Sequence, residues 1–245
     1  MISVIIPAFN EEKTIYDVVR YVASCDRVTE VIVVDDKSAD NTVGRAIQGG
    51  ATVITSEKLG KGTSMKEGLH CAKNNIVVFL DGDIHPYPQR TIDLLTKPIL
   101  EDRADFVKAS FTRNAGRVTE LLAKPLMNIF FPEIAHFEQP LSGMIAGKKS
   151  FFEKVDFCED YGVDIGILID MHIQKARIRE VRIGHIKNKS KTWQALGKMS
   201  KEVAVAIISR AEQQKREYLK LGAIQPFSEI RSHVEFAIKE LRGLH

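Results

Sequence analysis

Cysteine is scarce in this sequence: Cys25, Cys71 and Cys158 are its three cysteines, and they lie far apart. An odd number of cysteines without Cys-x-x-Cys spacing argues against a disulfide framework and against a structural zinc site. Unpaired thiols are the normal state in a reducing compartment. We therefore expect a cytoplasmic protein.

Long apolar runs are missing as well. No apolar stretch approaches the roughly 18 residues that a membrane-spanning helix needs. Met1 leads directly into ISVIIPAFNEE, which has no basic segment ahead of its apolar residues and so does not resemble a secretion signal. We expect a soluble chain without a transmembrane segment, folded from its first residues.

An excess of charge of one sign is also absent. The 35 lysines and arginines are nearly balanced by 32 aspartates and glutamates, which leaves a formal net charge of +3. Nucleic-acid-binding proteins usually carry a basic excess, so this class is disfavoured and we expect no nucleic-acid partner. The 245 residues, 44% of them hydrophobic, fit one self-supporting globular domain.

Neither common glycine-rich phosphate-binding motif occurs. A dinucleotide-binding Rossmann domain has Gly-x-Gly-x-x-Gly after its first strand, where this chain has PAFNEE. The segment LGKGTS lacks the upstream glycine spacing of an NTPase P-loop. A response-regulator receiver carries its acidic pair after the first strand, whereas VIVVDD follows the second. The sequence fits none of these three classes.

Three short segments predict buried strands: SVIIPAF, EVIVVDD and NIVVFLDGD. Each is β-branched and apolar without interruption, as in strands that are covered on both faces. Residues 11–24 and 62–73 between them have helical periodicity, the second with Thr63 or Ser64 as its cap. Strands that alternate with helices predict an α/β fold with a mostly parallel sheet. The residues expected on the inner helix faces are Ile15, Val18, Val19, Val22, Met65, Leu69 and Ala72.

The rest of the chain gives weaker patterns. DFVKASF reads as a further strand, residues 117–131 as a helix, and residues 161–176 as strand-like and then helical. Residues 195–222 and 228–243 read as two amphipathic helices. These two helices are suited to packing on the sheet or on a second subunit, and they make a homodimer plausible.

Acidic residues collect where the predicted strands end. Asp35 and Asp36 follow the second strand, and Asp81 and Asp83 follow a later one. Because the carboxyl ends of parallel strands meet at one edge of the sheet, ligands are expected there. With Gly82 leaving room between them, Asp81 and Asp83 can point two carboxylates to the same side. Hard oxygen ligands of this kind suit Mg²⁺ or Mn²⁺ shared with a diphosphate.

Read in order, VIIPAFNEE, VIVVDDKSADNT, GKG and VVFLDGD resemble the nucleotide-sugar-binding half of glycosyltransferases with the GT-A fold, related to families 2 and 81. In the second half, GRVTELLAKPLMNIFFPEI, QPLSGMIAGKKSFFEKVDF, YGVDIGILID and ALGKMSKEV closely resemble the glucosyl-3-phosphoglycerate synthases. The resemblance covers most of residues 1–210. It implies a GT-A type, Rossmann-like, mostly parallel sheet flanked by helices, with C-terminal helices.

The resemblance also implies an organisation and a set of donor residues. Residues 1–103 would bind the nucleotide sugar, residues 104–195 the acceptor, and residues 196–245 would form a helical extension of one GT-A domain, residues 1–245. Lys61 would lie near the diphosphate, and Asp164, where relatives commonly have Glu, near the sugar hydroxyls. The expected donor-binding residues are Pro7, Ala8, Glu11, Asp36, Lys61, Asp81 and Gly82. The expected catalytic residues are Asp83, Asp164 and Lys61.

For the acceptor and the metal, the resemblance implies two further groups. A doubly anionic acceptor needs a guanidinium with parallel donors, which Arg117 supplies. Asp83 would be the more direct metal ligand, with Asp81 beside it. The histidine that completes the family's metal site is either His185 or, by ungapped counting, displaced to the position of Asn188. The expected acceptor-binding residues are Gly116, Arg117, Thr119, Ser142 and Asn188.

Two departures from the family pattern concern the acceptor side. Met144 stands where relatives often carry Glu, and SFTRNA before GRVTEL is short where the family can have a long loop. Both departures leave the identity of the acceptor less well defined than that of the donor.

The activity implied is metal-dependent transfer of a hexose, glucose from an NDP-glucose and foremost from UDP-glucose, to 3-phosphoglycerate. Transfer to a polyprenyl phosphate is an alternative, for which LLAKPLMNIFFPEIAHF is the candidate docking surface. A sugar-nucleotide-binding protein without turnover is another, and a nucleotidyltransferase is disfavoured by the missing glycine-rich loop. The sequence leaves open the donor base, glucose against mannose, the retaining or inverting outcome and the oligomeric state.

Overall fold

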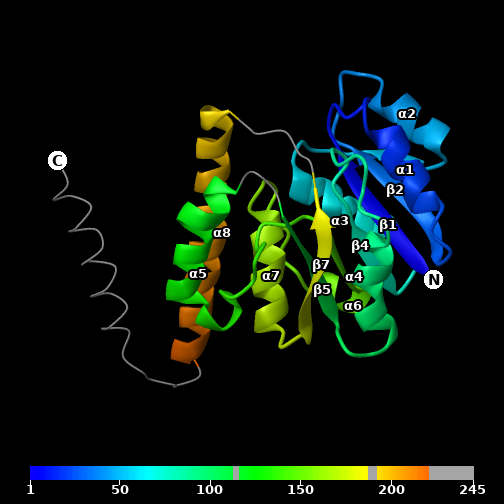
Figure 1. Cartoon of the computed structure of the whole chain (residues 1–245). Coiled ribbons are helices and arrows are strands. Elements are labelled where there is room, and N and C mark those ends of the chain that lie inside the picture. The colour runs from blue at the N-terminus through cyan, green and yellow to red at the C-terminus, as the bar shows by residue number, and fades with distance from the viewer. Residues whose placement is uncertain (113–115, 187–191, 221–245) are drawn as a thin grey trace.

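A seven-stranded sheet forms the centre of the molecule (Figure 1). The computed structural model describes residues 1–112, 116–186 and 192–220. The strand order is β3-β2-β1-β4-β6-β5-β7. Only β6 among these strands pairs antiparallel, with β4 and with β5, so the expected mostly parallel sheet is confirmed. The strands are β1 Ile2–Ala8, β2 Val28–Asp35, β3 Thr52–Thr55, β4 Ile76–Phe79, β5 Phe106–Thr112, β6 Ile145–Lys148 and β7 Ile178–His185.

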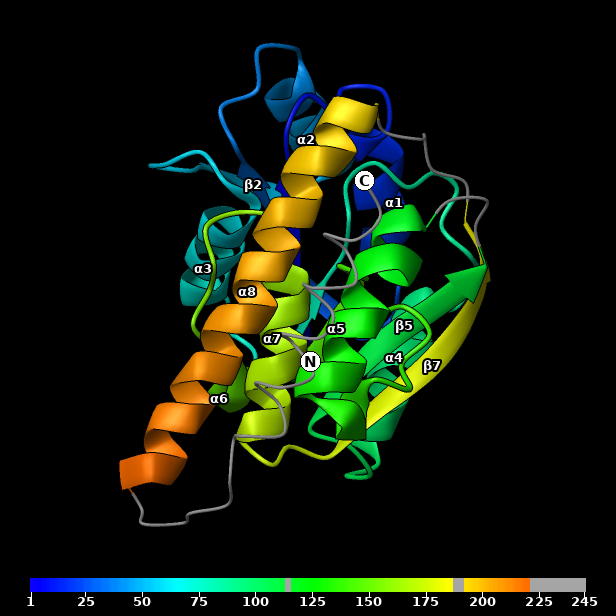
Figure 2. The same cartoon turned by 90° about the vertical axis from the view of Figure 1, so that its left-hand side faces the viewer.

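Helices cover both faces of the sheet. The described helices are α1 Ile15–Ala23, α2 Thr42–Gly49, α3 Lys61–Cys71, α4 Thr91–Leu100, the π-helical turn η1 Thr119–Ala123, α5 Lys124–Phe130, the short η2 Pro132–Ile134, α6 Lys149–Phe152, α7 Val163–Ile173 and α8 Trp193–Lys220. One hydrophobic core joins α1, α2 and α4 to the sheet, and a second core on the opposite face includes α3 and α5 to α8. Figure 2 shows α8 running along α7 and α5 as an outer layer.

The predicted inner faces of α1 and α3 are confirmed. Val18 and Val22 are buried against the sheet, and so are Met65 and Leu69. The same is true of the other members of the two sets: Ile15, Val19 and Ala72.

The predicted cap of α3 is wrong. The helix begins at Lys61 after Gly60, whose φ of +141° favours glycine. The Gly60 N–H donates to the carboxylate of Asp36, 3.0 Å away. The segment before α7 packs against this start: the Gly62 N–H donates to the carbonyl oxygen of Glu159, and a Cβ on Gly62 would overlap the carbonyl oxygen of Cys158.

The helix expected over residues 117–131 is confirmed, because residues 117–130 are continuously helical, with the π-helical turn η1 followed directly by α5. The first amphipathic C-terminal helix is confirmed as α8, whereas residues 228–243 lie outside the described residues. Within the described part of the chain, no helix is both long and apolar enough to cross a membrane.

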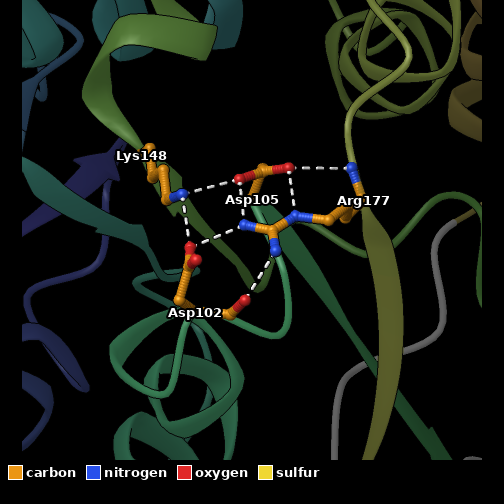
Figure 3. Close-up of polar contacts among 4 residues, drawn as sticks. All are labelled: Asp102, Asp105, Lys148 and Arg177. Atoms are coloured by element: carbon orange, nitrogen blue, oxygen red, sulfur yellow. Dashed lines mark hydrogen bonds and ion pairs between the residues drawn. The ribbon is translucent and has the colours of Figure 1, made fainter.

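A network of ion pairs joins three strands at the amino-terminal end of β5 (Figure 3). Asp105 accepts hydrogen bonds from Lys148 Nζ at 2.7 Å and from Arg177 Nε at 2.9 Å. The Arg177 backbone N–H also donates to it, at 3.0 Å, and Asp102 contacts the same two cations. The network therefore ties the ends of β6 and β7 to β5.

Replacing Asp105 by asparagine is expected to lower the free energy of unfolding by about 2 kcal/mol at pH 7, because several charge-assisted hydrogen bonds are lost from a nearly buried group. Hydrogen bonds from Arg177 above all, and from Lys148, hold the pKa of Asp105 well below its ordinary value, although burial opposes them. A depressed pKa stabilises the fold above the unfolded value near 4 and loses this effect as the pH falls. Denaturant titrations at pH 7 and pH 3 measure the difference.

The matched control for this prediction is Asp102→Asn, because Asp102 is 75% exposed and is expected to contribute less. Equal losses in the two variants, or a loss for Asp105→Asn that does not shrink as the pH falls below 4, would contradict the assignment.

Candidate active site

A cavity of about 1230 Å³ opens at the carboxyl-terminal edge of β1 and β4. Its walls come from the loops after β1, β2 and β4, from the start of α3, η1 and α7, and from the first turns of α8. The volume exceeds the usual range for one small ligand, about 300–1,000 Å³. The predicted residues that line it are Pro7, Ala8, Glu11, Asp36, Lys61, Asp81, Gly82, Asp83, Gly116, Arg117, Thr119, Ser142 and Asp164.

Lys61 is the centre of the charged wall. Its Nζ lies 2.9 Å from Asp81 Oδ1 and 2.8 Å from Asp164 Oδ2, so one ammonium bridges two carboxylates. Burial acts to lower the pKa of Lys61, but Asp164 and Asp81 outweigh it and raise the pKa well above the ordinary lysine value. Lys61 is therefore a permanent cation in the cavity.

Gly143 allows this bridge to form. A Cβ at this position would overlap Asp81 Oδ1 and would lie 2.5 Å from Lys61 Nζ. The absence of a side chain therefore lets the backbone before β6 pass against the ion pair. Sequence reasoning missed Gly143, although it lies in the quoted segment QPLSGM.

Asp164 has one carboxylate oxygen without a partner. The residue is 4% exposed, and its Oδ1 atom is buried without a hydrogen-bond partner among the described residues. Buried carboxylate oxygens are normally hydrogen-bonded, so such an atom in a cavity wall suits a hydroxyl donor from a ligand. The start of α7 holds this carboxylate against Lys61, which also contacts Asp81.

Lys108 lies beneath the cavity and was not predicted. Its side chain is fully buried in β5, and Nζ donates to the carbonyl oxygens of Ser142 at 2.7 Å and Asp164 at 3.2 Å. Burial lowers its pKa to about 8. The lysine thus ties the segment before β6 to the first turn of α7. A charged residue inside the apolar strand DFVKASF was the signal that could have identified it.

Asp36 has a structural task besides lining the cavity. Its carboxylate receives the Gly60 N–H and, more weakly, the Ser64 hydroxyl at 3.4 Å. These contacts fasten the GKG segment to the end of β2. Asp36 thereby positions Lys61, while its predicted contact with the nucleoside remains a prediction.

The donor set for a metal consists of the carboxylates after β4. Asp81 and Asp83 both line the cavity, and their oxygens are the kind that Mg²⁺ and Mn²⁺ prefer, with further positions left to a diphosphate and water. The residues therefore fit a hard divalent cation. Among the described residues, no group of three or more His, Cys, Asp or Glu side chains could hold a metal without such help.

The structure describes one of the two candidates for the family's histidine, His185. His185 is exposed at the end of β7 and is not among the residues that line the cavity. Its Nδ1 lies 3.4 Å from Thr112 Oγ1. Asn188 lies outside the described residues, so the choice between the two remains a prediction.

The residues predicted to bind the acceptor differ in their exposure. Arg117 is exposed at the cavity wall, whereas Thr119 and Ser142 are at most 3% exposed. Met144 does not belong to this wall: its side chain is fully buried in the core on the α1 and α4 face. The departure at Met144 therefore changes the core and does not remove a group from the cavity lining.

Comparison with known proteins shows which family the chain is related to. The profile of Glycosyl transferase family 2 matches residues 3–158. The glucosyl-3-phosphoglycerate synthase of Mycobacterium tuberculosis (strain CDC 1551 / Oshkosh) is 34% identical over an alignment that covers 85% of this chain and 73% of that protein.

Solved structures agree with the sequence relationship. Glucosyl-3-phosphoglycerate synthase from M. tuberculosis with Mn²⁺, UDP-glucose and phosphoglyceric acid has a TM-score of 0.83 and 35% identity, covering 86% of this chain and 80% of that one. The same synthase with Mg²⁺ and UDP has a TM-score of 0.82 and 35% identity, over 86% and 79% of the two chains. These matches confirm the GT-A type fold. The chain therefore belongs to glycosyl transferase family 2 and is a homologue of the glucosyl-3-phosphoglycerate synthases.

Proposed function

We propose that this glycosyltransferase moves glucose from UDP-glucose to 3-phosphoglycerate and releases UDP and glucosyl-3-phosphoglycerate. The observation that carries the proposal is that one cavity contains both predicted sets of residues. Asp81, Asp83 and Lys61 lie at the strand ends on the donor side, and Arg117 and Thr119 lie at the start of η1. The similarity to synthases that bind these two substrates supports the same pairing.

The donor half is proposed to orient the sugar nucleotide. Pro7, Ala8 and Glu11 are assigned to the nucleoside. Lys61 places a fixed positive charge beside the position of the diphosphate, and Asp164 Oδ1 accepts a hydrogen bond from a sugar hydroxyl. Both groups are held before substrate arrives, so catalysis is mainly positioning and charge stabilisation.

Asp83 and Asp81 are the residues proposed to hold Mg²⁺ or Mn²⁺. When bound, the cation neutralises negative charge on the diphosphate leaving group. Relatives in complexes with Mg²⁺ or Mn²⁺ together with UDP or UDP-glucose support this assignment.

The acceptor half is proposed to hold the phosphate and carboxylate of 3-phosphoglycerate through Gly116, Arg117, Thr119 and Ser142. The acceptor hydroxyl then attacks the anomeric carbon, its new C–O bond forms as the bond to the diphosphate breaks, UDP leaves, and the hydroxyl proton passes to solvent. In this division, residues 1–103 form the donor-binding half, residues 104–195 form the acceptor-binding half and also contribute Asp164 to the donor sugar, and residues 196–245 extend the single domain.

Other readings of the sequence have less support. The stretch considered for a polyprenyl phosphate places Met127, Phe131 and Ile134 in the core, at most 5% exposed. Turnover is favoured over simple binding because Asp83 and the Lys61 bridge lie in the same cavity. Free thiols at the three cysteines support a reducing, cytoplasmic location.

The test is UDP release from UDP-glucose with Mg²⁺, with and without 3-phosphoglycerate. We expect release only when acceptor and metal are both present, and a product in which glucose is joined to 3-phosphoglycerate. ADP-glucose and GDP-mannose serve as donor controls, and unphosphorylated glycerate and polyprenyl phosphate vesicles as acceptor controls. Release with the vesicles but not with 3-phosphoglycerate would refute the proposed acceptor.

A further inference from the structure

Arg117, which lines the cavity, makes a cation–π contact with an aromatic ring. Its guanidinium carbon lies 4.7 Å from the ring centroid of Trp193, the first residue of α8. Among the described residues, no carboxylate lies within ion-pair distance of Arg117, and its side chain makes no hydrogen bond. The indole is therefore the described group that holds this arginine, and it comes from a part of the chain 76 residues away.

The aromatic partner of Arg117 leaves the arginine able to bind an anion. The N–H donors of a guanidinium lie in its own plane and point outward from its edge. When the flat face of the group packs on an aromatic ring, these donors stay free to bind the oxygens of an anion. A carboxylate partner would occupy those donors and would compete with an anionic ligand. An aromatic partner restrains the arginine side chain without occupying its donors or repelling an anion. The restraint also reduces the side-chain conformational entropy that is lost when the anion binds.

Arg117 lines the cavity, whereas Trp193 lies just outside the lining and contacts Arg117 from there. Leu196 and Met199 line the cavity from the next turns of α8, and Gly116 and Thr119 line it on either side of Arg117. Trp193 itself is 70% exposed, which is unusual for a tryptophan without a function at a surface. The start of α8 thus lies against the side of the cavity that we assign to the acceptor.

We propose that Trp193 is a positioning residue of the acceptor site, which holds the Arg117 guanidinium with its in-plane donors directed at the acceptor phosphate. This inference rests on the proposed function, because it takes 3-phosphoglycerate as the acceptor. It adds α8 to the elements that determine acceptor affinity.

The kinetic test is Trp193→Ala. We expect the KM for 3-phosphoglycerate to rise roughly 5-fold, while kcat and the KM for UDP-glucose stay within about 2-fold, since only the restraint on Arg117 is lost. Trp193→Phe should recover part of the affinity because it keeps an aromatic face. Tyr16→Ala is the matched control: Arg45 lies 4.7 Å from the Tyr16 ring centroid in the same kind of contact, and neither residue lines the cavity.

A second test needs no turnover. Trp193 is the single tryptophan of the chain, so intrinsic tryptophan emission reports on this contact alone. We expect 3-phosphoglycerate to change the emission saturably, with a Kd that follows the KM. We expect Arg117→Met to remove the saturable change.

The outcomes separate the two proposals. If the wild-type chain does not transfer glucose to 3-phosphoglycerate, the proposed function fails and this inference fails with it. If the chain does so and Arg117→Met raises the acceptor KM while Trp193→Ala does not, this inference alone is overturned. An equal effect of Tyr16→Ala would also overturn it, because the loss would then reflect general stability.

Discussion

Replacing Lys61 by methionine is expected to lower kcat/KM for UDP-glucose by two to three orders of magnitude. The variant removes the ammonium that Asp81 and Asp164 share at 2.9 and 2.8 Å. Two carboxylates then face each other without a counter-charge, and the diphosphate loses a cation fixed in advance.

Steady-state kinetics with varied UDP-glucose and saturating 3-phosphoglycerate measure this effect. Lys73→Met is the matched control, because Lys73 is an exposed lysine just beyond the other end of α3. A loss of less than about 10-fold for Lys61→Met, or a similar loss for Lys73→Met, would show that the bridge is not part of the catalytic machinery.

Replacing Asp83 by asparagine is expected to reduce kcat by about 10²- to 10³-fold and to weaken Mn²⁺ binding at least 10-fold. Asp81 is already partly neutralised by Lys61, so loss of the charge on Asp83 leaves a divalent cation with little net attraction. Asparagine keeps the shape of the side chain, which limits the change to charge. Removal of the metal by a chelator should reduce the wild-type rate to a similar level.

Electron paramagnetic resonance of free Mn²⁺ measures binding, and UDP release measures kcat. Asp93→Asn makes the same change on an exposed position of α4 away from the cavity and should alter neither quantity. Unchanged Mn²⁺ affinity in Asp83→Asn would remove Asp83 from the proposed ligand set even if activity fell.

Strands and helices with a strong apolar pattern were predicted correctly, because the pattern of apolar residues within one element shows which of its faces are buried. The apolar segments of β1, β2 and β4 are buried on both faces, and the inner positions of α1 repeat at helical spacing. Edge elements were harder. Strand β7 alternates charged and apolar residues and is largely exposed, so IREVRIGH has no uninterrupted apolar run. Helix α4 contains Pro98, which weakens its helical signal.

By itself, the sequence determined the class of the fold, the edge of the sheet where the cavity opens and the residue types available there, because strand ends and helix faces depend on neighbours in the chain. The tertiary structure alone decided which of these residues meet. Lys61 lies 20 residues from Asp81 and 103 residues from Asp164. The contacts of Gly143 and of Lys108, and the contact of Arg117 with Trp193, likewise form where distant segments pack together. Such contacts cannot be predicted from the local periodicity of the sequence.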